Sequence, residues 1–135
     1  MNQDEIKLVL KDLSARYPYG VICQLCDGVT TIREKLGIGG LSAFENGTME
    51  IKPYLRPLSS MTKEEEVEFL NICGGVYLYK GEISITIDHP GCESVELPIT
   101  TIVRATNWLY SHHFDVNGLI EKGLALVAPE GMYDN

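Results

Sequence analysis

The residues best suited to acid–base chemistry lie together near the C-terminus. His112 and His113 are adjacent, Ser111 precedes them and Asp115 follows. A histidine titrates near neutral pH, a carboxylate can orient it, and the Ser111 hydroxyl could serve as a nucleophile. Adjacent side chains at a helix end point in different directions, however, and Asp115 is equally suited to capping a following helix. A small hydrolase or nucleotide-processing enzyme using His112, His113 and Asp115 is therefore an alternative hypothesis rather than the leading one.

Two of the four cysteines, Cys23 and Cys26, form a C-x-x-C motif. The motif falls in an apolar stretch typical of a strand, where residues i and i+3 point to opposite faces. The two sulfurs would then diverge, so metal binding needs a local kink. A redox C-x-x-C normally opens a helix, whereas the turn signal Asp27-Gly28 follows here. We expect free thiols and no cofactor, with Cys23 and Cys26 as the alternative metal ligands.

Two further clusters have simple structural explanations. Asp88, His89 and Cys92 fall in one loop, and a single loop rarely supplies a complete coordination sphere, so we expect a turn with a solvated histidine. Four glutamates at positions 64, 65, 66 and 68 open a predicted helix, where negative charge complements the helix dipole. Neither cluster predicts a catalytic or metal site.

Composition and charge limit the classes of function. With 135 residues, of which 44% are hydrophobic, the chain predicts one globular domain over residues 1–135. A net charge of −8, with the basic residues scattered along the sequence, argues against direct binding to a nucleic-acid backbone and favours a basic protein surface as partner. No apolar run approaches the roughly 20 residues that a membrane helix needs. The acidic N-terminus lacks the features of a signal peptide, so we expect a cytoplasmic protein with no membrane contact.

Hydrophobic periodicity and turn signals predict the elements that position these residues. Thr62 and Glu65 fit a capping box that opens a helix burying Val67, Leu70 and possibly Phe69. Other predicted helices cover residues 4–15, 98–111 and, as a short element capped by Asp115, 115–123. Predicted strands cover residues 19–26, 29–36, 48–55, 76–79, 83–87 and 124–127. We expect a loop at 37–40 and a loose tail from about residue 129.

This order of elements predicts an α+β fold. Its sheet is expected to be antiparallel, or a small partly open β-barrel, with about five to six strands and about three α-helices. Pro53 predicts an edge position or a bulge in its strand. On the helix over residues 98–111, Trp108 and His112 are four residues apart and should lie together.

Three phrases of the chain carry a resemblance to a known family. They are KDLSARYPYGV at 11–21, KPYLRPLSSMT at 52–62 and WLYSHHFD at 108–115, the last continuing through GLIEKGLA at 118–125. With these phrases the chain resembles a family of small uncharacterised proteins from gut anaerobic bacteria and from the tailed phages and prophages that infect them. The resemblance implies a short cytoplasmic protein encoded by a phage or another mobile element. It assigns no activity and no functional residue.

The leading hypothesis is a non-enzymatic protein-interaction module that binds a host or phage protein. Aromatic and arginine side chains dominate binding hot spots, which makes Tyr54, Arg56 and Trp108 the candidate anchors, together with Tyr17 and Tyr19. The competing interpretation is that most of these aromatics belong to the core. A third hypothesis is a structural protein that forms homo-oligomers.

Overall fold

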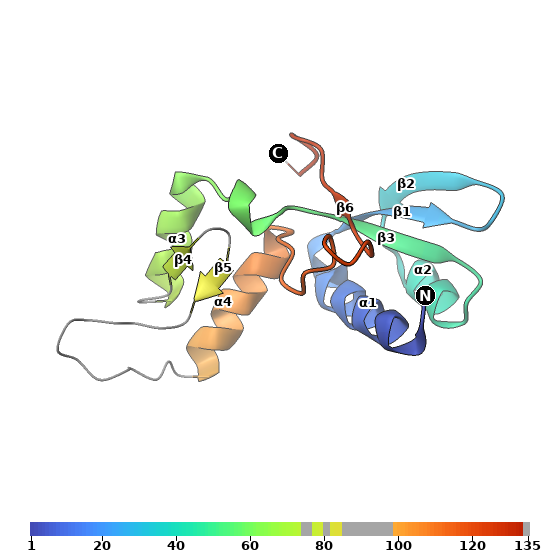
Figure 1. Cartoon of the computed structure of the whole chain (residues 1–135), viewed down its shortest axis with the longest axis horizontal. Helices are drawn as coiled ribbons and strands as arrows, with labels where there is room; N and C mark the ends of the chain where they lie inside the picture. Colours follow the sequence, from blue (N-terminus) through green and yellow to red (C-terminus); the bar gives the residue numbers. More distant parts are fainter. Residues whose placement is uncertain (74–76, 80–81, 85–98, 134–135) are drawn as a thin grey trace.

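The structure, a computed structural model, describes residues 1–73, 77–79, 82–84 and 99–133 (Figure 1). It confirms the α+β fold class. The described helices are α1 (Gln3–Arg16), α2 (Ile38–Glu45), α3 (Lys63–Cys73) and α4 (Ile99–Ser111), with short 3-10 turns η1 (Tyr17–Tyr19) and η2 (Leu58–Ser60). The described strands are β1 (Ile22–Cys26), β2 (Thr31–Lys35), β3 (Glu50–Leu55), β4 (Tyr77–Tyr79), β5 (Glu82–Ser84) and β6 (Leu126–Val127).

Four strands form an open sheet in the order β2-β1-β3-β6. The predicted hairpin is confirmed, since β1 and β2 pair antiparallel and the Asp27 carboxylate accepts the N–H groups of Val29 and Thr30 at 2.8 and 2.7 Å. The sheet is mixed rather than antiparallel, because β6 returns from the far end of the chain to run parallel to β3. It stays open because β2 and β6 do not meet, and β4 and β5 form a separate two-stranded ladder.

Pro53 lies inside the sheet at a position that tolerates its missing N–H. It stands opposite Cys23 on the β1 side, and β6 begins to pair with β3 only at the next residue, Tyr54. Among the described residues, the first part of β3 therefore has a neighbour on one side only. The sequence-based prediction of an edge-like position holds locally, although β3 as a whole is an interior strand.

Helix α2 replaces the loop that was expected at residues 37–40, and it raises the number of described α-helices to four. The glycines that suggested a loop have a packing role instead. A Cβ on Gly40 would lie 3.3 Å from a methyl carbon of Leu36 and 3.7 Å from methyl carbons of Ile51 and Leu25. The absence of a side chain thus lets α2 approach the sheet closely, and tertiary packing outweighs the low helix propensity of glycine.

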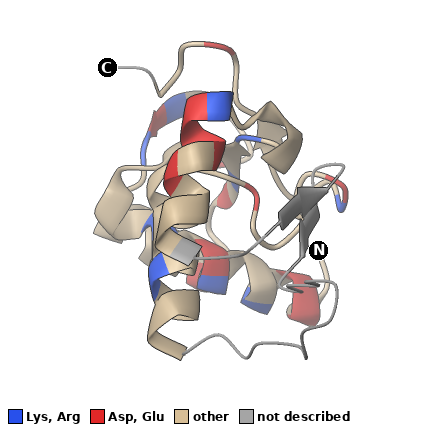
Figure 2. Ribbon diagram, turned by 90° about the vertical axis from the view of Figure 1, so that its left-hand side faces the viewer, with Lys and Arg blue, Asp and Glu red and all other residues tan. Residues whose placement is uncertain are grey.

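Helix α3 begins with the predicted capping box. Thr62 N donates to Glu65 Oε1 at 3.0 Å, and Glu65 N donates to Thr62 Oγ1 at 3.2 Å. Glu64, Glu65 and Glu66 lie in its first turn. Figure 2 shows the side of the molecule on which this helix lies, with the acidic residues in red. The predicted buried face is wrong in part, because Val67 and Leu70 are 59% and 39% exposed. The helix turns Phe69 toward α4 instead, where its ring centroid lies 5.3 Å from that of Trp108.

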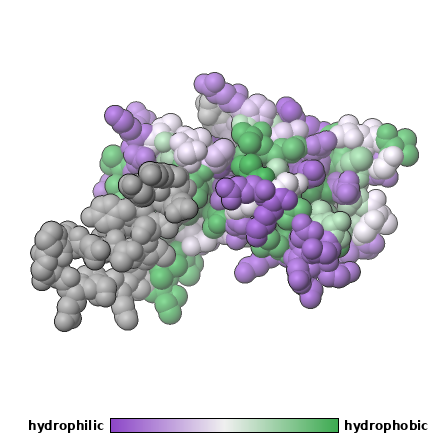
Figure 3. Space-filling model, in the orientation of Figure 1, coloured by the Kyte–Doolittle hydropathy of each residue, from purple (hydrophilic) through white to green (hydrophobic). Residues whose placement is uncertain are grey.

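Helix α4 matches its predicted range and buries Ala105, Trp108, Leu109 and Tyr110. Its first turns do not follow the expected apolar stripe, because Ile99 and Val103 are 79% and 50% exposed. Figure 3 shows apolar surface where this end of α4 meets solvent. The predicted burial of this helix is therefore confirmed only for its second half, which packs on α3 and Phe114.

The segment after α4 differs most from expectation. Residues 116–123 form successive turns rather than a short helix. Gly118 adopts a φ of 68°, and a left-handed residue in the middle of the stretch prevents a continuous α-helix; Gly123, with a φ of 72°, ends the last turn. The predicted final strand is present as β6. Beyond it, Tyr133 packs against the sheet within the segment that was expected to be loose.

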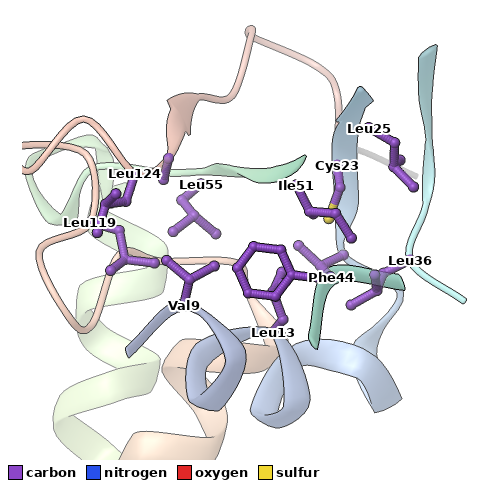
Figure 4. Packing of buried hydrophobic residues seen from close by; sticks show 12 residues of the cluster. Val9, Leu13, Cys23, Leu25, Leu36, Phe44, Ile51, Leu55, Leu119 and Leu124 are labelled. Carbon is purple, nitrogen blue, oxygen red and sulfur yellow. The ribbon is translucent and has the colours of Figure 1, made fainter. Parts of the chain in front are cut away.

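The main hydrophobic core lies between the sheet and the two helices α1 and α2, which cover the same face of the sheet (Figures 1 and 4). Val9 and Leu13 of α1 meet Cys23, Ile51 and Leu55 of the sheet, all fully buried. Each side chain of this kind stabilises the fold by about 1.5–3 kcal/mol when it leaves water. A second cluster, built on Phe69, Trp108 and Phe114, joins α3 to α4. None of the described helices is long and apolar enough to cross a membrane.

Several sequence-based expectations concern residues outside the described ranges. They are position 76 and positions 85–87 of two predicted strands, the loop with Asp88, His89 and Cys92, and position 98 of the helix predicted over 98–111.

Candidate functional site

The two histidines lie in a surface groove of about 780 Å³. The groove is lined by η1 and the residues that follow it, by the ends of β2 and α4, and by the residue after β3. Helix α3 and the C-terminal segment complete the lining. The lining residues are Tyr19, Gly20, Ile22, Lys35, Arg56, Glu65, Ser111, His112, His113, Met132 and Tyr133. Two of the predicted catalytic residues, His112 and His113, and two of the predicted anchors, Tyr19 and Arg56, thus share one site. We refer to it as the histidine groove.

Arg56 and Glu65 form the central ion pair of the histidine groove. Arg56 Nη1 and Nη2 donate to the two carboxylate oxygens at 2.8 and 2.7 Å, and the guanidinium also lies 4.2 Å from the Phe114 ring centroid. The hydrogen bond from Arg56 lowers the pKa of Glu65 to about 2. His112 Nδ1 lies 3.5 Å from Glu65 Oε2, within range of an ion pair when the ring is protonated. Arg56 is therefore committed to the fold, which limits its use as a binding anchor.

His113 occupies the position at which many helices end with glycine. Its φ is 66°, its N–H donates to Tyr110 O at 3.0 Å, and Phe114 N donates to Leu109 O at 3.0 Å. These two bonds form a Schellman motif, and Phe114 completes it by stacking on Trp108 with ring centroids 6.0 Å apart. A left-handed conformation is unfavourable for a residue with a Cβ. His113 adopts this conformation despite its cost, and its ring stacks on Tyr133 with ring centroids 3.6 Å apart.

The buried position of His113 makes its ring a poor proton carrier at neutral pH. The residue is 8% exposed and its Nδ1 has no hydrogen-bond partner among the described residues. Burial, reinforced by the nearby charges of Arg16, His112 and Arg56, lowers the pKa of His113 to about 4. The ring is therefore neutral at pH 7, and a base with so low a pKa accepts a proton weakly.

The three predicted catalytic residues do not form a catalytic unit. Asp115 directs its carboxylate away from both histidines, accepting the N–H groups of Leu119 at 2.8 Å and Ile120 at 3.1 Å. Capping was the alternative role that we predicted for Asp115. In the structure Asp115 caps the turns that follow α4 instead of a helix. Ser111 Oγ donates to Trp108 O at 2.7 Å, within its own helix. Asp115 therefore orients neither histidine, and Ser111 is bonded to its own helix rather than to a histidine ring.

The predicted anchors divide between core and surface. Trp108 is 8% exposed, donates from Nε1 to Glu68 Oε1 at 3.0 Å and stacks on His112 with ring centroids 4.1 Å apart. It lies beside His112 as predicted but belongs to the second core cluster. Tyr17 and Tyr19 are exposed on η1. Tyr54 is half-buried on the sheet, where the Arg33 guanidinium lies 4.7 Å from its ring centroid.

The two cysteines of the C-x-x-C motif lie in β1, as expected, and both are free thiols. Cys23 is fully buried, and burial raises the pKa of its thiol to about 12, which removes its reactivity near neutral pH. Cys26 is half-buried on the opposite face of the strand. Among the described residues, no group of three His, Cys, Asp or Glu side chains could hold a metal ion.

Tyr133 is a key residue of the groove that the sequence analysis did not identify. Its hydroxyl accepts the Ile22 N–H at 3.0 Å and donates to Tyr54 O at 2.7 Å. The β1–β3 register ends at Cys23 and Pro53, so Ile22 and Tyr54 would form the next pair. The hydroxyl thus links the two strands where their ladder stops. Burial raises the pKa of Tyr133 to about 12, so this bridge keeps its proton.

Asp12 and Arg16 form a second buried polar group behind the groove. Both side chains are fully buried, and Arg16 Nε donates to Asp12 Oδ1 at 2.6 Å. Arg16 Nη2 also donates to Phe114 O at 2.6 Å, and Asn117 Nδ2 donates to Asp12 Oδ2 at 2.8 Å. The pair therefore ties α1 to the end of α4. The i, i+4 spacing of Asp12 and Arg16 was a signal in the sequence, although Arg16 lies one residue beyond the helix predicted over 4–15; the spacing does not predict that the pair is buried.

The opposite face of the sheet from α1 and α2 gathers basic side chains. Side chains alternate along strands, and Cys23 and Leu25 point into the core, so Gln24 points outward. Gln24 stands opposite Arg33 in β2 and opposite Lys52 in β3, and Lys35 follows two residues after Arg33 on the same face. We call Arg33, Lys35 and Lys52 the basic face. Within the described part of the chain, none of the three forms an ion pair.

Comparison of the chain with protein-family models, with curated proteins and with solved structures finds no match. No residue role is therefore transferred from a relative.

Proposed function

We propose that the protein is a non-enzymatic interaction module that binds another protein through the outer face of its four-stranded sheet. The observation that carries the proposal is the unequal covering of the sheet. Helices α1 and α2 lie against one face (Figure 1), whereas Tyr54 and the basic face lie on the other. Tyrosine and arginine are enriched in binding surfaces, and this face presents Tyr54 beside Arg33.

The state of the histidine groove favours binding over catalysis. Its strongest polar groups are paired with one another: Arg56 with Glu65, and the Tyr133 hydroxyl with backbone groups. Asp115 caps the turns after α4, and His113 is neutral. Groups engaged in this way hold the fold together, and none of these five side chains is an activated nucleophile or base. The geometry therefore supports the leading hypothesis rather than the hydrolase or nucleotide-processing alternative.

Tyr54 is suited to act as the anchor of this surface. It projects from an interior strand, and Arg33 holds its ring through the stacked guanidinium and an Nη2–Oη contact of 3.3 Å. A side chain fixed before binding loses little conformational entropy in the complex. Of the predicted anchors, Tyr54 is thus the one whose position best fits the role.

The resemblance to proteins of phages and their hosts suggests the setting. In that setting the module acts in the cytoplasm and its partner is a host or phage protein. Binding to nucleic-acid backbones is disfavoured, since the net charge is −8. A second copy of the chain is the competing partner, as in the homo-oligomer hypothesis.

Site-specific photocrosslinking tests this proposal. Benzoylphenylalanine is placed at Tyr54 and, as a matched control, at Val67, which is exposed on α3, a helix that lies outside the four-stranded sheet (Figure 1). We expect one protein to be crosslinked from Tyr54 and not from Val67, at a stoichiometry verified by native mass spectrometry. Crosslinks from both positions, or only to a second copy of the chain, would refute the proposed binding surface.

A further inference from the structure

We propose that the free edge of β2 binds an acidic, extended segment of a partner protein as an additional strand of the sheet. This inference rests on the proposed function and specifies the chemistry of the partner. It combines an uncovered backbone edge with the charge of the side chains next to it.

The edge of β2 presents unpaired backbone groups. Leu36 N donates to Val21 O at 2.9 Å, which extends the β1–β2 ladder by one residue beyond Lys35. Because backbone groups alternate in direction along a strand, those of Thr31, Arg33 and Lys35 point away from β1. All residues of β2 are exposed, and no described element pairs with this edge. An edge of this kind is a template for adding a strand.

The net charge of −8 by itself favours a basic partner, but the basic face reverses the sign of the charge locally and selects for negative charge. Arg33 and Lys52 flank Gln24 in one row across three strands, which places them about 10 Å apart at the usual strand spacing. Lys35 lies on the same face of β2, and Glu50 is the only acidic residue among the outward positions of the three strands. A strand added beside β2 would carry its outward side chains next to Arg33 and Lys35. Carboxylates at alternate positions therefore match the surface.

Charge also decides between this partner and a second copy of the chain. Two β2 strands paired antiparallel about Arg33 would place Arg33 opposite Arg33 of the second copy, and like charges directly opposite are unfavourable. Such a pair would also bring together two chains of net charge −8 each. An acidic segment avoids the first of these repulsions and gains from the three basic side chains.

Fluorescence anisotropy with a synthetic probe tests the inference. The probe is a labelled octapeptide in which glutamate alternates with valine or threonine, and the control peptide has lysine in place of glutamate. We expect the glutamate probe to bind at least about tenfold more tightly than the lysine peptide. Its affinity should fall several-fold as salt rises from about 0.05 to about 0.5 M, because exposed charges are screened.

Two variants separate the backbone contribution from the charge contribution. Thr31→Pro removes an outward N–H without removing a β1–β2 hydrogen bond, and Thr31→Val is its matched control. Reversal of charge by Arg33→Glu with Lys35→Glu leaves the backbone intact. We expect Thr31→Pro and the charge reversal each to weaken binding about fivefold or more, and Thr31→Val to leave it within about twofold. Circular dichroism and thermal unfolding verify that every variant is folded.

Amide hydrogen exchange locates the bound peptide. We expect slower exchange at Thr31, Arg33 and Lys35 on adding the glutamate probe, with little change at the amides that already pair with β1. The inference is overturned by equal affinity for both peptides, by binding that Thr31→Pro and the charge reversal leave unchanged, or by dimerisation through β2. If no probe binds at about 1 mM while Tyr54 still crosslinks one protein, the strand-addition inference fails and the interaction module stands.

Discussion

The buried, neutral His113 predicts that the protein loses stability in mildly acidic solution. In the unfolded chain this histidine binds a proton below about pH 6.5. In the folded protein its pKa is lowered to about 4, because the ring is buried and lies near the charges of Arg16, His112 and Arg56. Between these two values the unfolded state binds more protons than the folded state. Stability is therefore complete above pH 6.5 and falls as the pH drops toward 4.

The size of the effect follows from the two pKa values. Lowering the pH from about 7.5 to about 5 should reduce the free energy of unfolding by about 2 kcal/mol through His113 alone. An unfolding entropy of about 2.1 cal/mol/K per residue converts this loss to about 7 °C in Tm for a chain of this length. Glu65 does not contribute in this range. Its pKa is lowered to about 2, so the stability it provides is present above about pH 4.5 and lost only as the pH falls further.

Urea denaturation at the two pH values measures the loss, and His113→Asn provides the comparison. Asparagine tolerates the left-handed conformation at this position but does not titrate. The variant should be less stable overall, because its side chain cannot stack on Tyr133 as the histidine ring does, yet its stability should change by less than about 0.5 kcal/mol between the two pH values. An NMR titration should place the midpoint of the His113 ring near pH 4. A midpoint near 6.5, or an unchanged pH dependence in the variant, would refute the reasoning.

Three further predictions concern buried polar groups. Tyr133→Phe should lower the free energy of unfolding by about 1–3 kcal/mol, because the Ile22 N–H and the Tyr54 carbonyl lose their shared partner; thermal unfolding measures this. Asp115→Ala should destabilise the protein by about 1–2 kcal/mol because the cap on Leu119 and Ile120 is lost. The crosslink from Tyr54 should remain. Loss of that crosslink in a variant of unchanged stability would contradict a purely structural role for Asp115. Arg16→Met should cost about 3–5 kcal/mol because it leaves the Asp12 carboxylate buried without its partner. The double variant with Asp12→Leu should recover a large part of that loss in urea denaturation, and no recovery would show that the ion pair is not the source of the effect.

Local signals in the sequence were sufficient for many of the secondary-structure elements. The Thr62–Glu65 capping box and the Asp27-Gly28 turn each act over three or four residues, so their outcome depends little on the rest of the chain. The helices that became α1 and α4 were predicted nearly to their ends, since apolar periodicity marks both. Trp108 and His112 lie together for the same local reason, four residues apart on one helix.

Predictions that depended on long-range packing were less accurate. The burial of Phe69 in place of Val67 and Leu70 was decided by where α4 lies, and periodicity alone allowed either face. The glycines at 37, 39 and 40 indicated a loop because glycine is a poor helix former. Contact with Leu36 and Ile51 instead made Gly40 a site of close packing. Tyr133 lies in a segment with no periodic pattern. Its hydroxyl bonds to Tyr54 and Ile22, which are 79 and 111 residues away in the sequence.

The sequence by itself determined the α+β class and most helix and strand positions, because these follow from short-range backbone preferences and the periodicity of apolar residues. The tertiary structure alone decided what the polar residues do. It turned Asp115 toward the turns after α4, paired Arg56 with Glu65 and buried His113 against Tyr133. It also gathered Arg33, Lys35 and Lys52, scattered in the chain, on one face of the sheet. Strand register brings residues about twenty positions apart into one row, and no local pattern in the sequence encodes that register.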